Sequence, residues 1–126
     1  MDKNQLQDQL YSLLVPSEIL LSFDIVSVIE KKEEILINLL EKEELIPLVL
    51  AGKASVLNGF MNVLEIQSSP IQCKTCYLKL KRRRWKQRGT SDSTNCHNEY
   101  DYTSPGTKAT KLFGAFLKEN GWETSI

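Results

Sequence analysis

The sequence predicts an α+β fold, in which a small antiparallel sheet is flanked by an N-terminal and a C-terminal amphipathic helix. Apolar residues recur at helical spacing near both ends of the chain, and β-branched segments lie between them. A hydrophobic content of 41% in 126 residues is enough for one domain with its own core. We therefore expect a single domain over residues 1–126, helical over 1–22, mainly β with loops over 23–104, and helical again over 105–120.

The N-terminal segment has the pattern of a short amphipathic helix. Leucines recur at helical spacing between residues 6 and 14, and Pro16 ends the pattern. Ser17 then precedes the apolar residues 19–21, which predicts a capped second turn of helix leading to Phe23. Both segments are expected to contribute to the core.

Two apolar, β-branched segments follow, at residues 24–29 and 35–40, separated by a charged break at residues 30–34. This arrangement favours an antiparallel hairpin. The second segment also fits one face of a helix, so the helical alternative stays open.

The next stretch alternates between turn signals and strand signals. Residues 48–59 contain Gly52, Asn58 and Gly59 and are expected to be irregular. Residues 63–67 resume a strand pattern, which Pro70 should end.

Alternate residues between Cys73 and Trp85 predict a strand with two different faces. Cys76, Leu78 and Leu80 would pack inward. The solvent face would carry Tyr77, Lys79, Lys81, Arg83 and Trp85.

The most informative feature is a cationic run within this strand. Seven of the ten residues from Lys79 to Arg88 are Lys or Arg, and none is acidic. The net charge of the whole chain is zero, but residues 1–50 carry about −6 and residues 51–126 about +6. Such a run is typical of a site that binds a polyanion, because phosphate contacts release condensed counterions.

Two other interpretations of this run remain open. Charged residues also protect edge strands from aggregation, although three adjacent arginines, Arg82 to Arg84, repel one another unless an anion lies nearby. Trp85 fits either a base-stacking residue or an anchor in the core.

The cysteines form a possible metal site. Cys73 and Cys76 have CxxC spacing, and Cys96 and His97 follow twenty residues later, so the four could bind zinc in a nucleic-acid module. Residues three apart on a strand point to opposite faces, which argues against this arrangement. We expect no metal and no cofactor.

The cysteine count and the N-terminus bear on the compartment. An odd number of cysteines, three in all, favours a reducing environment over a disulfide framework. The first residues lack the apolar stretch of a signal peptide, and no segment reaches the roughly 20 apolar residues that cross a bilayer. A cytoplasmic location is expected.

The C-terminal part is predicted to return to the core and end in a helix. Residues 89–105 are rich in turn formers and would return through Tyr100 and Tyr102. A helix should begin near Thr107 and end near Asn120. Its apolar stripe comprises Ala109, Leu112, Phe113, Phe116 and Leu117, with Lys108, Lys111 and Lys118 outside it.

The chain resembles the N-terminal region of ISAon-type bacterial insertion-sequence transposases. The opening residues 13–16 and 23–24 fit the likeness, which spans nearly the whole chain. The strongest matches are Leu64-Glu65-Ile66-Gln67, Pro70-Ile71, Tyr77-Leu78, Arg82-Arg83-Arg84-Trp85, Gly106-Thr107-Lys108, Thr110-Lys111 and Phe116-Leu117-Lys118-Glu119. Wider relatives carry zinc-ribbon cysteines after the basic strand, where this chain has Lys86-Gln87-Arg88.

The resemblance implies a non-catalytic DNA-binding module that takes part in transposition, a form of DNA recombination, by contacting the ends of a mobile element. No acidic triad of a nuclease is recognisable, so no enzymatic activity is expected. The expected DNA-binding residues are Lys79, Lys81, Arg82, Arg83, Arg84, Trp85, Lys86, Arg88, Lys108 and Lys111. The alternative is an interaction subunit that docks a separately encoded transposase catalytic chain.

Overall fold

The structure, a computed structural model, describes residues 2–89 and 94–120. Its elements in chain order are α1 (Lys3–Leu14), α2 (Ser17–Leu20), β1 (Phe23–Glu30), β2 (Glu34–Glu41), η1 (Leu48–Leu50, a 3₁₀ turn), β3 (Ser55–Phe60), β4 (Leu64–Ile71), β5 (Lys74–Lys81), β6 (Arg83–Gln87) and α3 (Lys111–Glu119). The predicted α+β class with a helix at each end is confirmed.

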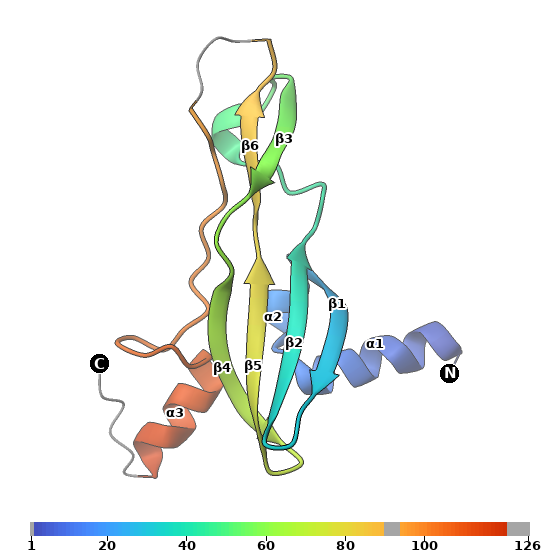
Figure 1. The fold of residues 1–126 in the computed structure, drawn as a ribbon, viewed down its shortest axis with the longest axis vertical. Coiled ribbons are helices and arrows are strands. Elements are labelled where there is room, and N and C mark those ends of the chain that lie inside the picture. The colour runs from blue at the N-terminus through green and yellow to red at the C-terminus, as the bar shows by residue number, and fades with distance from the viewer. Residues whose placement is uncertain (1, 90–93, 121–126) are drawn as a thin grey trace.

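The main sheet has four strands in the order β1-β2-β5-β4 (Figure 1). The β1–β2 and β4–β5 pairs are antiparallel, whereas β2 and β5 run parallel. The sheet therefore consists of two hairpins joined along one parallel seam, and it is mixed where the sequence suggested an antiparallel sheet.

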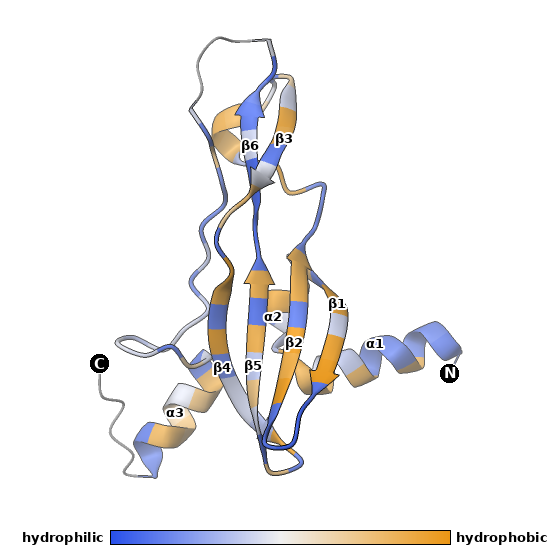
Figure 2. Ribbon diagram, viewed as in Figure 1, coloured by the Kyte–Doolittle hydropathy of each residue, from blue (hydrophilic) through white to orange (hydrophobic). Residues whose placement is uncertain are grey.

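The predicted β1–β2 hairpin is confirmed, and the helical alternative for residues 35–40 is wrong. Buried and half-buried residues alternate strictly along β2, with Ile35, Ile37 and Leu39 pointing into the core. This period of two belongs to a strand with one buried face. In Figure 2, β2 is mostly orange, because Leu36 and Leu40 on its half-buried face are also hydrophobic.

The core lies on one face of the main sheet. Val15 and Ile19, from the ends of the two N-terminal helices, pack there together with Phe23 of β1. The rings of Tyr100 and Tyr102 cover the same region, with centroids 5.1 and 6.2 Å from that of Phe23. The expected return of the chain through these tyrosines is therefore confirmed.

The predicted strand over residues 73–85 begins one residue later and is interrupted once. Gln72 and Cys73 both have positive φ, at 52° and 63°, and form the two-residue turn between β4 and β5. The strand breaks at Arg82, after which β6 pairs with β3 in a separate two-stranded sheet.

Two further expectations on the central strands need correction. The irregular stretch predicted over residues 48–59 is wrong for residues 55–59, which lie in β3 because its backbone groups pair with β6. Pro70 does not end its strand, since β4 continues to Ile71. Because β4 lies at the side of the sheet, the missing N–H of a proline is tolerated there.

The C-terminal helix α3 begins at Lys111, later than the expected residue 105. Thr110 caps it by accepting a hydrogen bond from the backbone N–H of Phe113. The preceding residues instead pair with β4: the backbone N–H of Gln67 donates to Lys108, and that of Thr110 donates to Gln67. Within the described part of the chain, no helix is long and apolar enough to span a membrane.

Candidate nucleic-acid interface

A two-stranded ribbon, formed by β3 and β6, projects beyond one end of the main sheet (Figure 1). Its strands continue the β4–β5 hairpin, and the short turn η1 lies beside them. We call this pair of strands the ribbon and its free end, around Lys53 and Arg88, the tip. The backbone N–H of Arg88 donates to the carbonyl of Ala54, which closes the tip.

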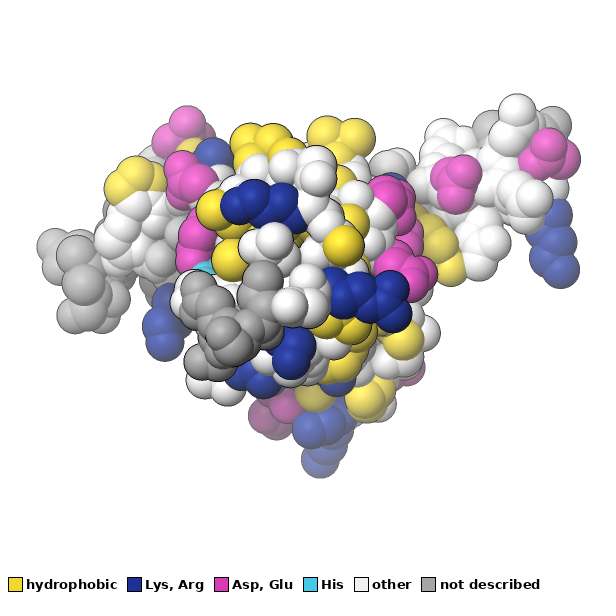
Figure 3. Space-filling model, turned by 90° about the horizontal axis from the view of Figure 1, so that it is seen from above, with side chains coloured by type: hydrophobic (Ala, Val, Ile, Leu, Met, Phe, Trp, Pro, Cys, Tyr) yellow, Lys and Arg dark blue, Asp and Glu magenta, His cyan; other side chains and the backbone are white. Residues whose placement is uncertain are grey.

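The ribbon carries basic residues but no acids. Residues 45–64 and 66–91 contain no Asp or Glu. Viewed onto the tip, Lys and Arg side chains are interspersed with hydrophobic ones (Figure 3). Among the described residues, no carboxylate forms an ion pair with Lys53, Lys81, Arg84, Lys86 or Arg88.

Arg82 does not belong to this exposed set. The residue is buried, and its Nη1 donates to the carbonyl oxygen of Asn98 at 3.1 Å and to Glu99 Oε2 at 3.3 Å. Arg82 is one of the residues expected to bind DNA, but its side chain lies against the returning segment and not on the solvent face. The backbone break between β5 and β6 turns Arg82 toward the returning segment, residues 94–104.

Arg83 and Arg84 are half-buried, and both are held by backbone carbonyls. Arg83 Nε donates to the carbonyl of Glu41 at 2.9 Å, and Arg84 Nε donates to that of Asn58 at 2.7 Å. A carbonyl bond uses one of the five guanidinium donors and leaves the positive charge unneutralised.

Trp85 is buried, although the alternation of residues along the strand predicted that it lies on the solvent face. Its backbone pairs with Cys96 on one side and Leu57 on the other. Stacking of Trp85 on a base would require this packing to open, so the anchor interpretation fits the structure.

Phe60 is an aromatic residue of this surface that sequence reasoning missed. Lys81 Nζ lies 4.4 Å from the centroid of its ring, and the Arg83 guanidinium carbon lies 5.9 Å away. Such contacts orient cations while leaving their charge available, and each contributes about 0.5–1 kcal/mol at an exposed site. The signal was weak because Phe60 lies twenty residues before the cations in the sequence.

The remaining predicted residues lie apart from the tip. Lys79 on β5 pairs with Glu65 on the neighbouring strand β4. Lys108 and Lys111 lie at the start of α3, near the opposite end of the molecule, and Lys111 Nζ is 3.8 Å from Asp101 Oδ2. The structure therefore does not bring these three lysines together with Lys86 and Arg88.

The cysteines are likewise separated. Cys73 is exposed at the β4–β5 turn, Cys76 is buried in the core, and Cys96 lies beside Trp85 on β6. Burial raises the pKa of the Cys76 thiol to about 11, which opposes the thiolate form that binds metals. Within residues 2–89 and 94–120, no group of three or more His, Cys, Asp or Glu side chains is arranged to hold a metal ion.

His97 contacts a carboxylate, its Nε2 lying 2.6 Å from Glu99 Oε1. The other oxygen of Glu99 accepts from Arg82, so these three side chains form one chain of contacts. These contacts help to hold the returning segment, residues 94–104, against β6.

Comparisons with protein-family models, with curated proteins and with solved structures gave no match for this chain. The arguments about its function therefore rest on the charge, burial and geometry described above. A protruding, acid-free basic ribbon is suited to contact a polyanion.

Proposed function

We propose that this protein is a non-catalytic DNA-binding module in which the ribbon contacts the phosphate backbone. The observation that carries the proposal is a group of cations that have no carboxylate partner among residues 2–89 and 94–120, on a part of the chain that contains no acid: Lys53, Lys81, Arg84, Lys86 and Arg88. In keeping with the resemblance to ISAon-type transposases, we propose the ends of an insertion element as the DNA.

The structure changes which residues should carry the binding. Arg82 and Lys79 already have intramolecular carboxylate partners, so a phosphate would compete with Glu99 and Glu65 for them. Lys81, Lys86 and Arg88 have no such competitor among the described residues. We therefore assign the main phosphate contacts to the latter three, with Arg84 in support.

Salt dependence of DNA binding tests this assignment. The Lys81→Ala, Lys86→Ala, Arg88→Ala triple variant should lower the slope of log affinity against log salt by about 3 in fluorescence anisotropy with duplex DNA. The matched control replaces Lys3, Lys31 and Lys32, three cations of the acidic half, and should leave the slope unchanged. An unaltered slope in the ribbon variant would reject the assignment.

A second candidate is a protein-interaction subunit that docks a separately encoded transposase catalytic chain. The favouring observation is the exposure of large apolar side chains near the tip, Leu48 at 91% and Val49 at 63%. Mixed apolar and basic surfaces also occur in protein interfaces. Binding of the partner chain without DNA, abolished by Leu48→Glu, together with no affinity for element-end DNA, would favour this candidate.

A further inference from the structure

Helix α1 lies largely outside the core, which it meets through its last residue, half-buried Leu14. None of its 12 residues is buried, and Figure 1 shows it extending away from the sheet. Asp2 and Gln5 form a complete capping box at its start: the backbone N–H of Gln5 donates to Asp2 Oδ1 at 2.8 Å, and that of Asp2 donates to Gln5 Oε1 at 3.1 Å. An isolated helix of this length is marginal in water, so a partner surface is expected to stabilise it.

The exposed apolar residues of α1 form a single stripe. Leu6, Leu10 and Leu13 are 51%, 50% and 76% exposed, and their spacing of four and three places them on one side of the helix. Because Leu10 lies near the middle of this stripe, two copies of α1 that run antiparallel can pack stripe against stripe. A second copy of α1 would place Leu10 against Leu10 and Leu6 against Leu13.

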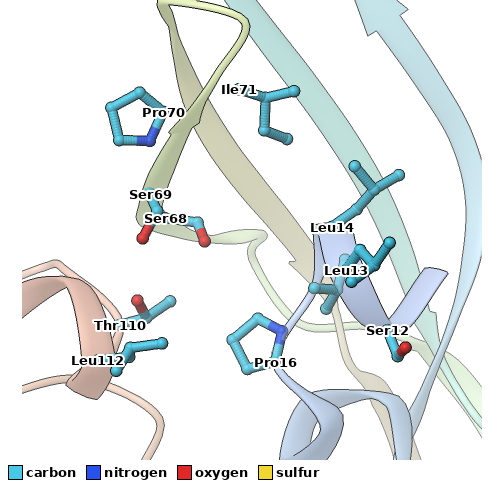
Figure 4. Close-up of a pocket in the computed structure, with 11 residues that line it drawn as sticks. Ser12, Leu13, Leu14, Pro16, Ser68, Ser69, Pro70, Ile71, Thr110 and Leu112 are labelled. Atoms are coloured by element: carbon cyan, nitrogen blue, oxygen red, sulfur yellow. The ribbon is translucent and has the colours of Figure 1, made fainter. Parts of the chain in front are cut away.

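A groove continues this stripe past the C-terminal end of α1 (Figure 4). It encloses about 170 Å³ between the end of α1, the end of β4 and the start of α3. Its apolar lining is Leu13, Leu14, Pro16, Pro70, Ile71 and Leu112. Leu112 is 77% exposed, so this wall is not covered within the described part of the chain.

The charges beside the groove suit the N-terminus of a second α1. In the antiparallel arrangement, Asp2 of the second copy lies about 12 Å beyond its Leu10, given a rise of about 1.5 Å per residue. The start of α3 lines the groove through Thr110 and Leu112, and Lys111 between them is half-exposed, with its Nζ 3.8 Å from Asp101 Oδ2. Asp2 of the second copy would compete with Asp101 for this lysine. By two-fold symmetry each copy makes the same contact, as in an isologous interface.

We infer that α1 and the groove beside it form the interface of a two-fold symmetric dimer of this chain. Leu6, Leu10 and Leu13 of each copy pack against those of the other, and each Asp2 approaches the Lys111 of the other copy. The interface lies at the end of the sheet opposite the ribbon, so the inference is independent of the proposed DNA contact.

Light scattering after gel filtration, without DNA, tests the oligomeric state. The full chain should have twice the mass of one copy, and Leu10→Glu should raise the dimer dissociation constant at least tenfold while the variant still unfolds cooperatively. The control is Leu21→Glu, at a residue 75% exposed but outside the stripe, which should remain dimeric. A chain that stays monomeric at millimolar concentration would overturn the inference.

Cysteine cross-linking tests the antiparallel register. In a background with Cys73 and Cys96 replaced by Ser, Leu10→Cys should form a disulfide-linked dimer under mild oxidation. Leu6→Cys and Leu13→Cys should link to each other when mixed but not to themselves. Self-linking of Leu6→Cys as efficient as that of the mixture would indicate a parallel pair and contradict the arrangement.

Discussion

The carboxylate of Glu41 accepts a hydrogen bond from the backbone N–H of Arg83, with 2.9 Å between Oε1 and N. Its other oxygen accepts from the hydroxyl of Tyr100 and, at 3.2 Å, from the side-chain amide of Asn98. This fully buried acid therefore joins the end of β2, the start of β6 and the returning segment. The direction in which the ribbon leaves the sheet depends on these contacts.

Replacing Glu41 by Ala should destabilise the protein by about 3 kcal/mol, because three half-buried donors lose a buried, charged acceptor at once. Urea denaturation followed by circular dichroism would measure the loss. Glu43→Ala is the matched control, since Glu43 is exposed two residues away, and it should change stability by less than about 0.5 kcal/mol. Equal effects of the two substitutions would contradict a structural role for Glu41.

Arg82 and Lys86 should respond in opposite ways to substitution, although both belong to the same basic run. Arg82→Ala should lower stability by about 1–3 kcal/mol, since it removes the donor to Asn98 and Glu99. Lys86→Ala should leave stability nearly unchanged and lower the salt slope of DNA binding by about 1. Measuring both quantities on both variants separates structural cations from those proposed to bind phosphate.

Stability should fall at alkaline pH because of Tyr100. Burial, followed by its hydrogen bond to Glu41, raises the pKa of this phenol above its ordinary value of 10. Above pH 10 the unfolded chain releases the proton while the folded chain keeps it, so each such tyrosine lowers stability by about 1.4 kcal/mol per pH unit. Burial also raises the pKa of Tyr102, which adds to the slope.

Denaturation at a series of pH values from about 8 to about 11.5 would measure this slope. Tyr100→Phe should make the decline above pH 10 shallower, because one of the three groups with a raised pKa, Cys76, Tyr100 and Tyr102, is gone. The quantity to compare between the two proteins is the slope of stability against pH, because loss of the hydrogen bond to Glu41 also lowers stability at every pH. A slope unchanged by Tyr100→Phe would show that the phenol does not contribute.

Thiol chemistry should distinguish Cys73 from Cys76. A pKa of about 11 leaves only about one Cys76 thiol in a thousand ionised at pH 8, and the residue is also shielded in the core. Cys73 is exposed and should react with a thiol reagent in the native protein, whereas Cys76 should react only after unfolding. Cys73→Ser should abolish this fast native phase, and rapid labelling of Cys76 would refute its burial.

The elements with a local pattern were predictable from the sequence. The leucine spacing of α1 predicts a helix, although Leu6, Leu10 and Leu13 are exposed and do not meet the core. The β-branched residues of β1 and β2 predict the hairpin. The caps differ from the prediction. The expected cap at Ser17 is wrong, because Ser17 is the first residue of α2 and its N-cap, Pro16, makes no side-chain hydrogen bond. The caps at Asp2 and Thr110 were not predicted.

The rest depends on contacts between distant residues. The parallel seam between β2 and β5 leaves no trace in either segment alone. Arg82 is buried because Glu99 and Asn98 reach it from a segment 16 to 17 residues further along the chain. In the sequence, the ten-residue run therefore has the pattern of one cationic strand. In the structure, its residues divide between the core and the surface.

The separation of charge along the chain becomes a separation in space. The acidic residues 1–50 supply both N-terminal helices and the β1–β2 hairpin, and the ribbon extends from the second hairpin with no acid of its own. A molecule with no net charge thus has a permanent electric dipole along its length. In the field of any polyanion it experiences a torque that turns the tip forward before contact, and added electrolyte weakens this alignment.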